Sequence, residues 1–372
     1  MHKVCLFDVT ASHYRSEIFK SMDNTFDIDF YFGNMMPSIK TMDVHVLSGY
    51  KETLNVKKVG PLFWYDKMLS IVIKEYDTII FDGDYRCLST WIALLLCRCL
   101  NKRAYIWTHG FYGKERGLKS LIKFLFVRLC TGCLIYGDYA KMIMVNDYKI
   151  PKSKLYVVHN SLDYTTQSKI RRTLKHSTIY SEHFNNNYPT IIFIGRLTAV
   201  KKLEMIICAQ KLLKEKGIDI NVVIVGEGPQ RESLVELVDK YGLKDMVWFF
   251  GASYDENVNA ELLYNADICV SPGNIGLTAI HSLTYGTPAI THDYWSEQMP
   301  EFEAIKKGKT GDFFEYGSVN SLANVIENWL LKHQSREEVR NNCFQIIDDE
   351  WNPMYQLKIL KKVINDDSKK NC

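Results

Sequence analysis

The sequence predicts an α/β protein of two domains, each built on a parallel sheet, and three observations support this prediction. The chain has 372 residues, which is more than one compact core usually holds. Apolar residues make up 47% of it and charged residues 24%, the balance of a globular protein. Short β-branched and aromatic runs alternate with helix-length segments from end to end, as in repeated βαβ units.

Strands are expected where β-branched and aromatic residues form short runs. In the first half these runs are Val4–Phe7, Phe26–Phe32, Thr78–Phe81, Arg103–Trp107, Cys133–Tyr136 and Leu155–Val158. In the second half they are Thr190–Ile194, Ile220–Val225, Val247–Phe250, Ile268–Val270 and Ala289–Thr291. Helical spacing of apolar residues predicts a helix soon after Gly195 and another in Asn352–Asn365. The apolar run Trp91–Leu100 is too short to cross a bilayer and predicts a buried helix.

The domain boundaries follow from composition. Residues 1–165 form the expected N-terminal domain, and the polar, basic stretch 166–188 is the expected linker. Residues 189–340 form the expected C-terminal domain. The segment 341–372 is predicted to be helical and to cross back to the first domain.

Charge and cysteine usage exclude several classes of protein. A formal net charge of +3 does not predict a nucleic-acid partner. The first residues show no secretion signal, so we expect a cytoplasmic protein whose ten cysteines stay reduced. Cys130 and Cys133 have the spacing of half a zinc or redox site, but no second pair accompanies them, and we expect core thiols. No metal site is predicted.

The first candidate site follows the strand Thr190–Ile194. Gly195 lets the chain turn tightly where the strand ends, and the next helix presents free amide groups to an anion. Arg196 can grip phosphate oxygens in bidentate fashion, and Lys201 adds a point charge. The segment predicts a phosphate-binding site, although two solvated surface cations would show the same pattern.

A second glycine-containing loop joins the buried strand Ile268–Val270 to a helix that begins near Leu277. Gly273, Asn274 and Gly276 allow this loop to approach a ligand closely, and the amides of Leu277 and Thr278 open the helix behind it. The earlier turn Gly226–Pro229 lacks the third glycine of a dinucleotide fingerprint, which argues against a dehydrogenase.

Taken in order, these motifs resemble a known family. Gly-Arg-Leu-x3-Lys from Gly195, Val-Gly-Glu-Gly-Pro from Val225, Ala-Asp-Ile-x-Val-Ser-Pro from Ala266 and Gly-Leu-x6-Leu-x2-Gly-Thr-Pro from Gly276 are similar to the donor half of the retaining GT-B glycosyltransferases of family 4, glycosyl transferases group 1. The resemblance covers roughly residues 190 to 315. It implies two Rossmann-like domains facing each other across a cleft, a UDP- or GDP-linked sugar held mainly by the second domain, and no cofactor or metal.

The resemblance implies roles for named residues. Arg196 and Lys201 would contact the donor diphosphate, while Gly195, Gly273, Asn274, Gly276, Leu277 and Thr278 would line the donor site. The family usually has two glutamates where this chain has Gly273 and His281. His281 could donate to the ribose or be an ordinary helix residue. Glu297, Glu301 and Glu303 are candidates to replace the missing carboxylate.

The first half supplies acceptor-side candidates. His109, followed by a glycine at a strand end, resembles the family's cleft histidine near the reacting sugar, and it is a catalytic candidate together with Arg196 and Lys201. His13, Tyr14 and Arg15 follow the first strand and would face the acceptor. Seven Lys or Arg residues and one acid lie between Asn101 and Leu129. That segment is either an ordinary sheet-covering helix or a peripheral contact with the cytoplasmic membrane face.

The expected activity is transfer of a hexose or N-acetylhexosamine, with retention, from a nucleotide sugar to a saccharide or a lipid-linked saccharide, in surface polysaccharide biosynthesis. Two alternatives stay open, a sugar-nucleotide epimerase of the same fold and a catalytically silent sugar-nucleotide-binding subunit. The Asp-x-Asp sequence Asp82–Asp84 matches the metal site of the other main glycosyltransferase fold, but that fold would not explain the donor motifs.

Overall fold

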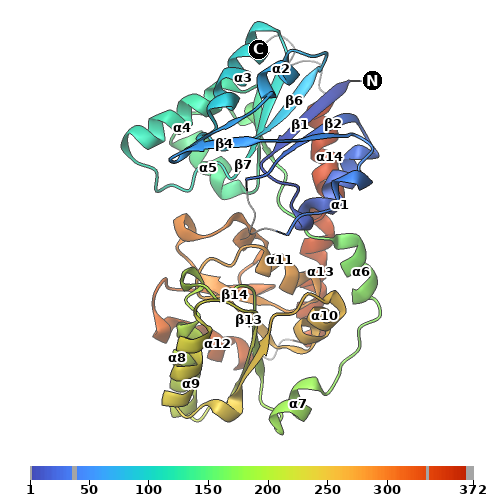
Figure 1. Ribbon diagram of the computed structural model, residues 1–372. Coiled ribbons are helices and arrows are strands. Elements are labelled where there is room, and N and C mark those ends of the chain that lie inside the picture. Colours follow the sequence, from blue (N-terminus) through green and yellow to red (C-terminus); the bar gives the residue numbers. More distant parts are fainter. Residues whose placement is uncertain (1, 36–39, 332–334, 366–372) are drawn as a thin grey trace. The chain divides into compact units, whose positions relative to one another are not determined.

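The computed structural model describes residues 2–35, 40–331 and 335–365, and the chain divides into two compact units (Figure 1). Unit 1 consists of residues 1–163 and 352–372, and unit 2 of residues 164–351. The expected linker 166–188 instead holds two helices, α6 (Tyr164–Arg171) and α7 (Ile179–Phe184), and belongs to unit 2. Its polar composition reflects short exposed helices rather than a bare connection.

Unit 1 is built on a parallel sheet with the strand order β3-β2-β1-β6-β7-β8-β9. Its strands are β1 (Lys3–Asp8), β2 (Asp27–Gly33), β3 (Tyr50–Leu54), β6 (Thr78–Asp82), β7 (Arg103–Thr108), β8 (Gly132–Ile135) and β9 (Leu155–Val157), and β4 (Val56–Val59) and β5 (Leu62–Tyr65) form a hairpin. Its helices are α1 (Ser16–Asp23), α2 (Met68–Val72), α3 (Leu88–Cys99), α4 (Gly117–Leu129), α5 (Asp138–Asn146) and α14 (Pro353–Ile364), with 3-10 turns η1 (His13–Arg15), η2 (Val44–Val46) and η3 (Lys152–Lys154).

Unit 2 has a second parallel sheet with the order β12-β11-β10-β13-β14-β15. Its strands are β10 (Thr190–Ile194), β11 (Asn221–Val225), β12 (Val247–Gly251), β13 (Ile268–Val270), β14 (Ala289–His292) and β15 (Gly311–Phe314). Besides α6 and α7, its helices are α8 (Glu204–Glu215), α9 (Arg231–Lys240), α10 (Glu256–Asn265), α11 (Leu277–Thr284), α12 (Val319–Leu331) and α13 (Arg336–Glu350), with 3-10 turns η4 (Ala199–Lys201), η5 (Lys244–Met246), η6 (Trp295–Glu297) and η7 (Pro300–Ala304). The predicted α/β class with two parallel-sheet domains is confirmed.

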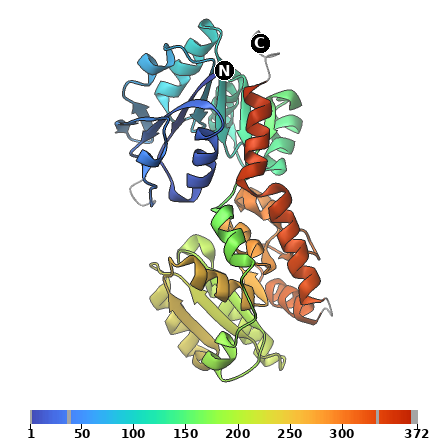
Figure 2. The same ribbon diagram turned by 90° about the vertical axis from the view of Figure 1, so that its right-hand side faces the viewer.

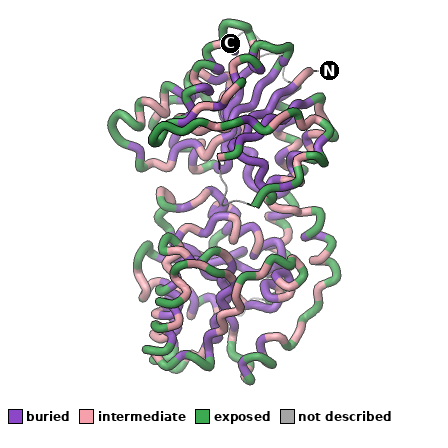
Figure 3. Tube along the Cα trace, in the orientation of Figure 1, coloured by how far each residue is buried: buried purple, intermediate pink, exposed green. Residues whose placement is uncertain are grey.

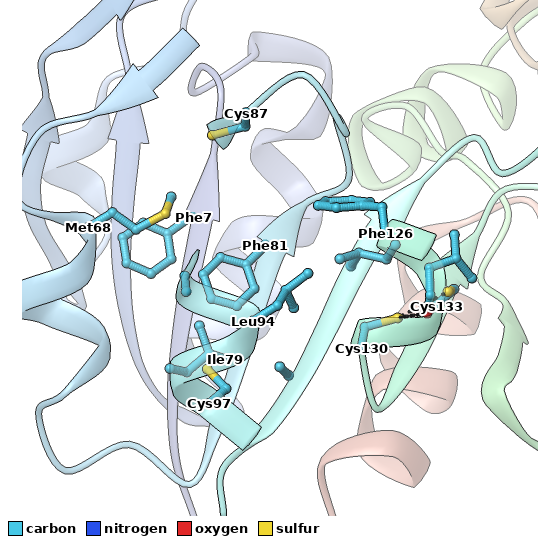
Figure 4. Packing of buried hydrophobic residues seen from close by; sticks show 14 of the residues in the cluster. Phe7, Met68, Ile79, Phe81, Cys87, Leu94, Cys97, Phe126, Cys130 and Cys133 are labelled. Atoms are coloured by element: carbon cyan, nitrogen blue, oxygen red, sulfur yellow. Dashed lines mark hydrogen bonds between the residues drawn. The ribbon is translucent and has the colours of Figure 1, made fainter. Parts of the chain in front are cut away.

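The central strands are nearly continuous apolar runs because helices cover both faces of each sheet. In β1, Cys5 and Phe7 point into one core cluster, and Val4 and Leu6 into the other. This alternation follows from the two-residue period of a strand. Figure 4 shows the cluster that contains Phe7, where the Cys130 and Cys133 sulfurs lie 3.5 Å apart and both residues are buried. Both cysteines therefore pack as core residues.

The end of the chain returns to unit 1 in helix α14, which lies beside the N-terminal elements in Figure 2. Leu360, Val363 and Ile364 are buried in the cluster that contains Val4 and Leu6. Arg103 on β7 donates a hydrogen bond from Nη2 to the Ile364 carbonyl at 2.7 Å. Helix α13, whose second half falls in the expected 341–372 segment, packs against α11 in unit 2 instead.

One predicted burial was wrong. The run Trp91–Leu100, expected as a buried helix, lies largely in α3, which buries Ala93, Leu94 and Cys97 but exposes Ile92 and Leu95 to solvent. Hydropathy alone could not distinguish a fully buried helix from one whose second face is also apolar. None of the helices in the described residues is both long and apolar enough to span a bilayer.

Candidate functional site

The candidate donor site lies at the carboxyl edge of the sheet of unit 2, where the strand order reverses. Strand β10 is flanked by β11 on one side and β13 on the other, which makes this a topological switch point where open α/β sheets bind ligands. The loop after β10 begins at Gly195, whose φ is 150°. Gly226 packs directly against it, since a Cβ at Gly226 would lie 1.9 Å from the Gly195 carbonyl oxygen. Glycines therefore let two strand-end loops meet at this edge.

Lys201 holds together two loops of the site. Its ammonium donates hydrogen bonds to the Asn274 carbonyl at 2.5 Å, to the Asn274 side-chain oxygen at 3.0 Å and to the Ile275 carbonyl at 3.4 Å. Burial lowers the pKa of Lys201 to about 8; the buried Glu301 carboxyl opposes this shift and Arg196 adds to it. Lys201 thus fixes the glycine loop and carries a charge that neighbouring groups can tune near neutral pH.

Arg196 has a different environment. It is exposed, immediately after Gly195. Within residues 2–35, 40–331 and 335–365, its guanidinium has no hydrogen-bond or ion-pair partner, yet it lies near enough to lower the pKa of Lys201. An arginine held beside a second cation, with no acid paired to it, provides a favourable position for an anion.

The glycine loop before α11 explains why a glutamate is missing. A Cβ on Gly273 would lie 1.9 Å from the Val200 carbonyl oxygen, and the Gly273 amide donates to the Lys201 carbonyl at 2.9 Å. The loop after β10 therefore occupies the space that any side chain at this position would need. Gly276 has a φ of 55° at the start of α11, and a Cβ there would lie 3.7 Å from the Met299 side chain, so its positive φ rather than a clash favours glycine.

The start of α11 is tied to β10. The Thr278 hydroxyl donates a hydrogen bond to the Ile194 carbonyl at 3.0 Å. The Leu277 and Thr278 amides lie in the first turn of an eight-residue helix, where backbone N–H groups have no partner within the helix. The structure thus brings Gly195, Lys201, Gly273, Asn274, Gly276, Leu277 and Thr278 together at one sheet edge, with Arg196 beside Lys201.

His281 is engaged within the protein. Its Nε2 lies 3.0 Å from Oε1 of Glu256, a residue on α10. The same oxygen accepts hydrogen bonds from Tyr285 at 2.7 Å and from Gln167 at 2.8 Å. Burial acts to raise the pKa of Glu256, but these hydrogen bonds, of which that with His281 has the largest effect, lower it to about 2. A carboxylate is therefore present on this side of α11, supplied by a different helix, and sequence analysis did not single it out.

The loop after β14 supplies two further buried polar residues. The Gln298 side chain accepts a hydrogen bond from the Ile275 amide at 3.0 Å and donates to Thr291 at 2.7 Å. Glu301 is 1% exposed and acts on the charge of Lys201. Of the three acids suggested as replacements, Glu297 is exposed and Glu303 half-buried, so Glu301 is the one enclosed beside the site. Gln298 was missed because a lone glutamine carries no sequence signal.

A second pocket, of about 330 Å³, lies within unit 1 at the carboxyl ends of β1, β6, β7 and β8. Its lining includes three of the acceptor-side candidates, Tyr14, Arg15 and His109, but not His13, which is exposed. Arg15 is buried in an ion pair with Asp8, and its guanidinium lies 4.3 Å from the Trp107 ring centre.

Asp82 and His109 in this pocket have shifted pKa values. Burial lowers the pKa of His109 to about 4, helped by Lys123 and Arg15, so its imidazole is neutral at pH 7. Burial, with Asp8 and Asp84 nearby, raises the pKa of Asp82 to about 8. Asp84 is ion-paired with Arg86 at 2.5 Å, and no group of three or more metal-binding side chains occurs in the described parts of the chain.

Two domains, each with a parallel sheet and a candidate ligand site at the carboxyl ends of its strands, define the GT-B class of fold. Among solved structures, HepE from Anabaena in complex with UDP superposes with a TM-score of 0.69 at 14% identity, covering 97% of this chain and 99% of that one. Residues 177–345 match the family described as Glycosyl transferases group 1. The resemblance inferred from the motifs is therefore confirmed over residues 177–345.

Two curated relatives are similar to part of the chain. The α-D-kanosaminyltransferase of Streptomyces kanamyceticus is 23% identical over 223 residues, which cover 58% of this chain and 55% of that protein. The GDP-mannose-dependent α-(1-6)-phosphatidylinositol dimannoside mannosyltransferase of Mycobacterium tuberculosis is 37% identical over 103 residues, or 27% of this chain and 26% of that one. The chain thus spans about half of the first relative's length and about a quarter of the second's.

Proposed function

We propose that the protein transfers a monosaccharide from a UDP- or GDP-linked donor to a saccharide or lipid-linked saccharide, with retention of configuration. The observation that carries the proposal is the closeness of exposed Arg196 and half-buried Lys201 at the switch point of a domain that matches a glycosyltransferase family. Relatives support the donor class: the mycobacterial relative is GDP-mannose-dependent by name, and HepE was crystallised with UDP.

In this proposal the donor pyrophosphate lies against the loop after β10 and the start of α11. Arg196 binds its oxygens, Lys201 keeps the glycine loop in place and contributes positive charge, and the Leu277 and Thr278 amides donate to a phosphate oxygen. As the glycosidic bond breaks, negative charge grows on the leaving diphosphate, and fixed donors at that position lower the barrier. The acceptor hydroxyl then attacks from the face that the diphosphate leaves.

Glu301 and Glu256 are proposed to supply the negative charge that position 273 cannot. Glu301 lies buried beside Lys201, where it can stabilise positive charge that develops on the donor sugar. Glu256 orients His281, whose ring would then face the donor nucleoside. His109, neutral at pH 7, is proposed to hydrogen-bond a sugar hydroxyl in the pocket of unit 1, together with Tyr14 and Arg15. A role in surface polysaccharide synthesis belongs to the same proposal.

Nucleotide binding followed by product analysis tests the proposal. UDP, GDP and their sugar derivatives are screened for thermal stabilisation, since a ligand that binds only the folded state raises its apparent stability. We expect stabilisation by one nucleotide class and release of free nucleoside diphosphate when an acceptor extract is added. A rearranged, intact sugar nucleotide would instead show an epimerase, and donor binding without turnover a silent binding subunit.

A further inference from the structure

Helices α3 and α4 together expose a set of large apolar side chains. Three residues on each helix are between 41% and 71% exposed, namely Leu88, Ile92, Leu95, Leu118, Leu121 and Leu125, and we call them the apolar face. On each helix they recur three or four residues apart, so they form one stripe. Exposed leucines gathered in this way are uncommon on a surface that meets only water.

The two stripes belong to one surface. Helices α3 and α4 are neighbours, with the Trp91 and Phe126 rings 5.1 Å apart. Both helices bury their opposite sides in the same core cluster, α3 through Leu94 and Cys97 and α4 through Phe126 and Val127. Their exposed sides therefore face away from the sheet in the same direction. The helices lie next to each other in Figure 1, and exposed segments run along them in Figure 3.

The charges carried by the two helices of the apolar face are all positive. Neither α3 nor α4 contains an aspartate or glutamate. Arg98, Lys119 and Arg128 lie on the two helices, and Arg116 immediately precedes α4. The nearby Glu115 is buried and paired with Lys123 at 2.7 Å. An apolar stripe bordered by cations complements a negatively charged lipid surface.

The start of α4 also borders a cationic pocket of about 440 Å³. Five cations line it, Arg86, Lys114, Arg116, Lys119 and Lys123, against two acids, Asp84 and Glu115. The cationic pocket shares Asp84, Tyr85, Tyr112 and Lys123 with the 330 Å³ pocket that contains Arg15 and His109. That first pocket is rich in aromatic rings, and its Asp8–Arg15 pair balances its charge, which suits an uncharged sugar ring.

We propose that the apolar face docks on an anionic bilayer and that the acceptor is a saccharide joined through phosphate to a membrane lipid. The sugar occupies the 330 Å³ pocket, its phosphate the cationic pocket, and its lipid remains in the bilayer beside Leu118 and Leu121. The order of surfaces in unit 1, neutral, then cationic, then apolar, matches the order of groups in such a molecule. The acceptor assignment rests on the proposed glycosyl transfer, whereas bilayer docking does not.

Sedimentation of the full chain with vesicles tests the docking. One set is phosphatidylcholine alone, and the other contains one third phosphatidylglycerol. We expect binding to the anionic set, a loss of at least about tenfold for Leu118→Ser/Leu121→Ser/Leu125→Ser, and about 25-fold weaker binding for Arg116→Ala/Lys119→Ala, from roughly fivefold per cation. Leu331→Ser, at an equally exposed leucine of unit 2, is the matched control and should bind like wild type.

Several results would overturn the docking proposal. One is wild-type protein that stays in the supernatant, and another is a triple-serine variant that sediments like wild type. A third is leucine-dependent dimerisation in light scattering, which would assign the apolar face to a second copy of the chain. Unchanged thermal unfolding and UDP or GDP binding by each variant show that it is folded and separate this test from a failure of the donor site.

Dodecyl phosphate, dodecanol and inorganic phosphate test the phosphate pocket, with thermal stabilisation as the readout. We expect stabilisation by dodecyl phosphate alone, lost in Arg116→Ala/Lys119→Ala. Equal stabilisation by inorganic phosphate would reduce the pocket to an anion site without lipid, and equal stabilisation by dodecanol would remove the role of phosphate. Either result contradicts the lipid-linked acceptor.

Discussion

Replacing Arg196 with alanine should weaken nucleotide binding while leaving the fold intact. The side chain is exposed, and among the described residues it has no hydrogen-bond or ion-pair partner. Substitutions at such surface positions usually change the free energy of unfolding by less than about 0.5 kcal/mol. Because the guanidinium contributes little to folding, any large effect on binding comes from its contact with ligand.

The expected size follows from the chemistry of that contact. A bidentate, charge-assisted hydrogen bond between arginine and a phosphate contributes about 2–3 kcal/mol. Since about 1.4 kcal/mol corresponds to tenfold in a dissociation constant, Arg196→Ala should raise the Kd for UDP or GDP by about 30- to 150-fold. The kcat/KM of glycosyl transfer should fall by a similar factor if the contact persists in the transition state.

Isothermal titration calorimetry with UDP and GDP measures the effect, alongside thermal unfolding without nucleotide. Arg172→Ala provides the control, because Arg172 is another exposed arginine of unit 2. An Arg196→Ala protein that binds within twofold of wild type would refute the assignment. A drop of several degrees in Tm would show instead that Arg196 supports the fold.

Three further predictions follow from the same contacts. Wild-type nucleotide affinity should fall as pH rises through about 8, because the Lys201 ammonium is lost there, whereas Lys201→Met should bind weakly at every pH. Titration calorimetry measures both pH profiles, and parallel profiles would exclude a role of the Lys201 charge in nucleotide binding. Gly273→Ala should destabilise unit 2 by several kcal/mol, since its Cβ would lie 1.9 Å from the Val200 oxygen. The control Gly217→Ala, whose Cβ would have nothing within 4 Å, should cost about 1 kcal/mol because of its positive φ. Equal midpoints of the two variants in denaturant unfolding would contradict this prediction. Asp82 keeps its proton in the folded state up to about pH 8 but loses it near pH 4 when unfolded, so the free energy of unfolding falls as pH rises between these values. The free energy of unfolding of Asp82→Asn should exceed that of wild type by more than about 1 kcal/mol at pH 8 and equal it below pH 4. A difference between the two proteins that does not vary with pH would refute the pKa shift of Asp82.

The sequence predicted the parallel strands well because buried strands are marked by local apolar runs. All eleven expected strands occur within two residues of their predicted ends. The missed strands are β3 (Tyr50–Leu54), β15 (Gly311–Phe314) and the β4–β5 hairpin, which contain glycine, lysine or exposed positions that weaken that signal. Edge strands of this kind form because neighbours pair with them, which a local pattern does not record.

The candidate site was predictable where glycines allow tight turns of the backbone and cations follow them at fixed spacing. That pattern pointed to Arg196, Lys201 and Gly276, which the structure brings to one sheet edge. It did not reveal Glu256 or Gln298, whose importance comes from contacts with His281 and Ile275 across other elements. Nor did it show that α3 exposes Leu88, Ile92 and Leu95. When both sides of a helix are apolar, hydropathy does not indicate which side faces the core and which faces solvent.

The central claim is that a nucleotide pyrophosphate binds between the loop after β10 and the start of α11. A crystal structure of the protein with UDP or GDP tests it most directly. The account predicts pyrophosphate oxygens within hydrogen-bond distance of the Arg196 guanidinium and of the Leu277 and Thr278 amides. A pyrophosphate bound elsewhere on the chain, with that edge empty, would contradict it.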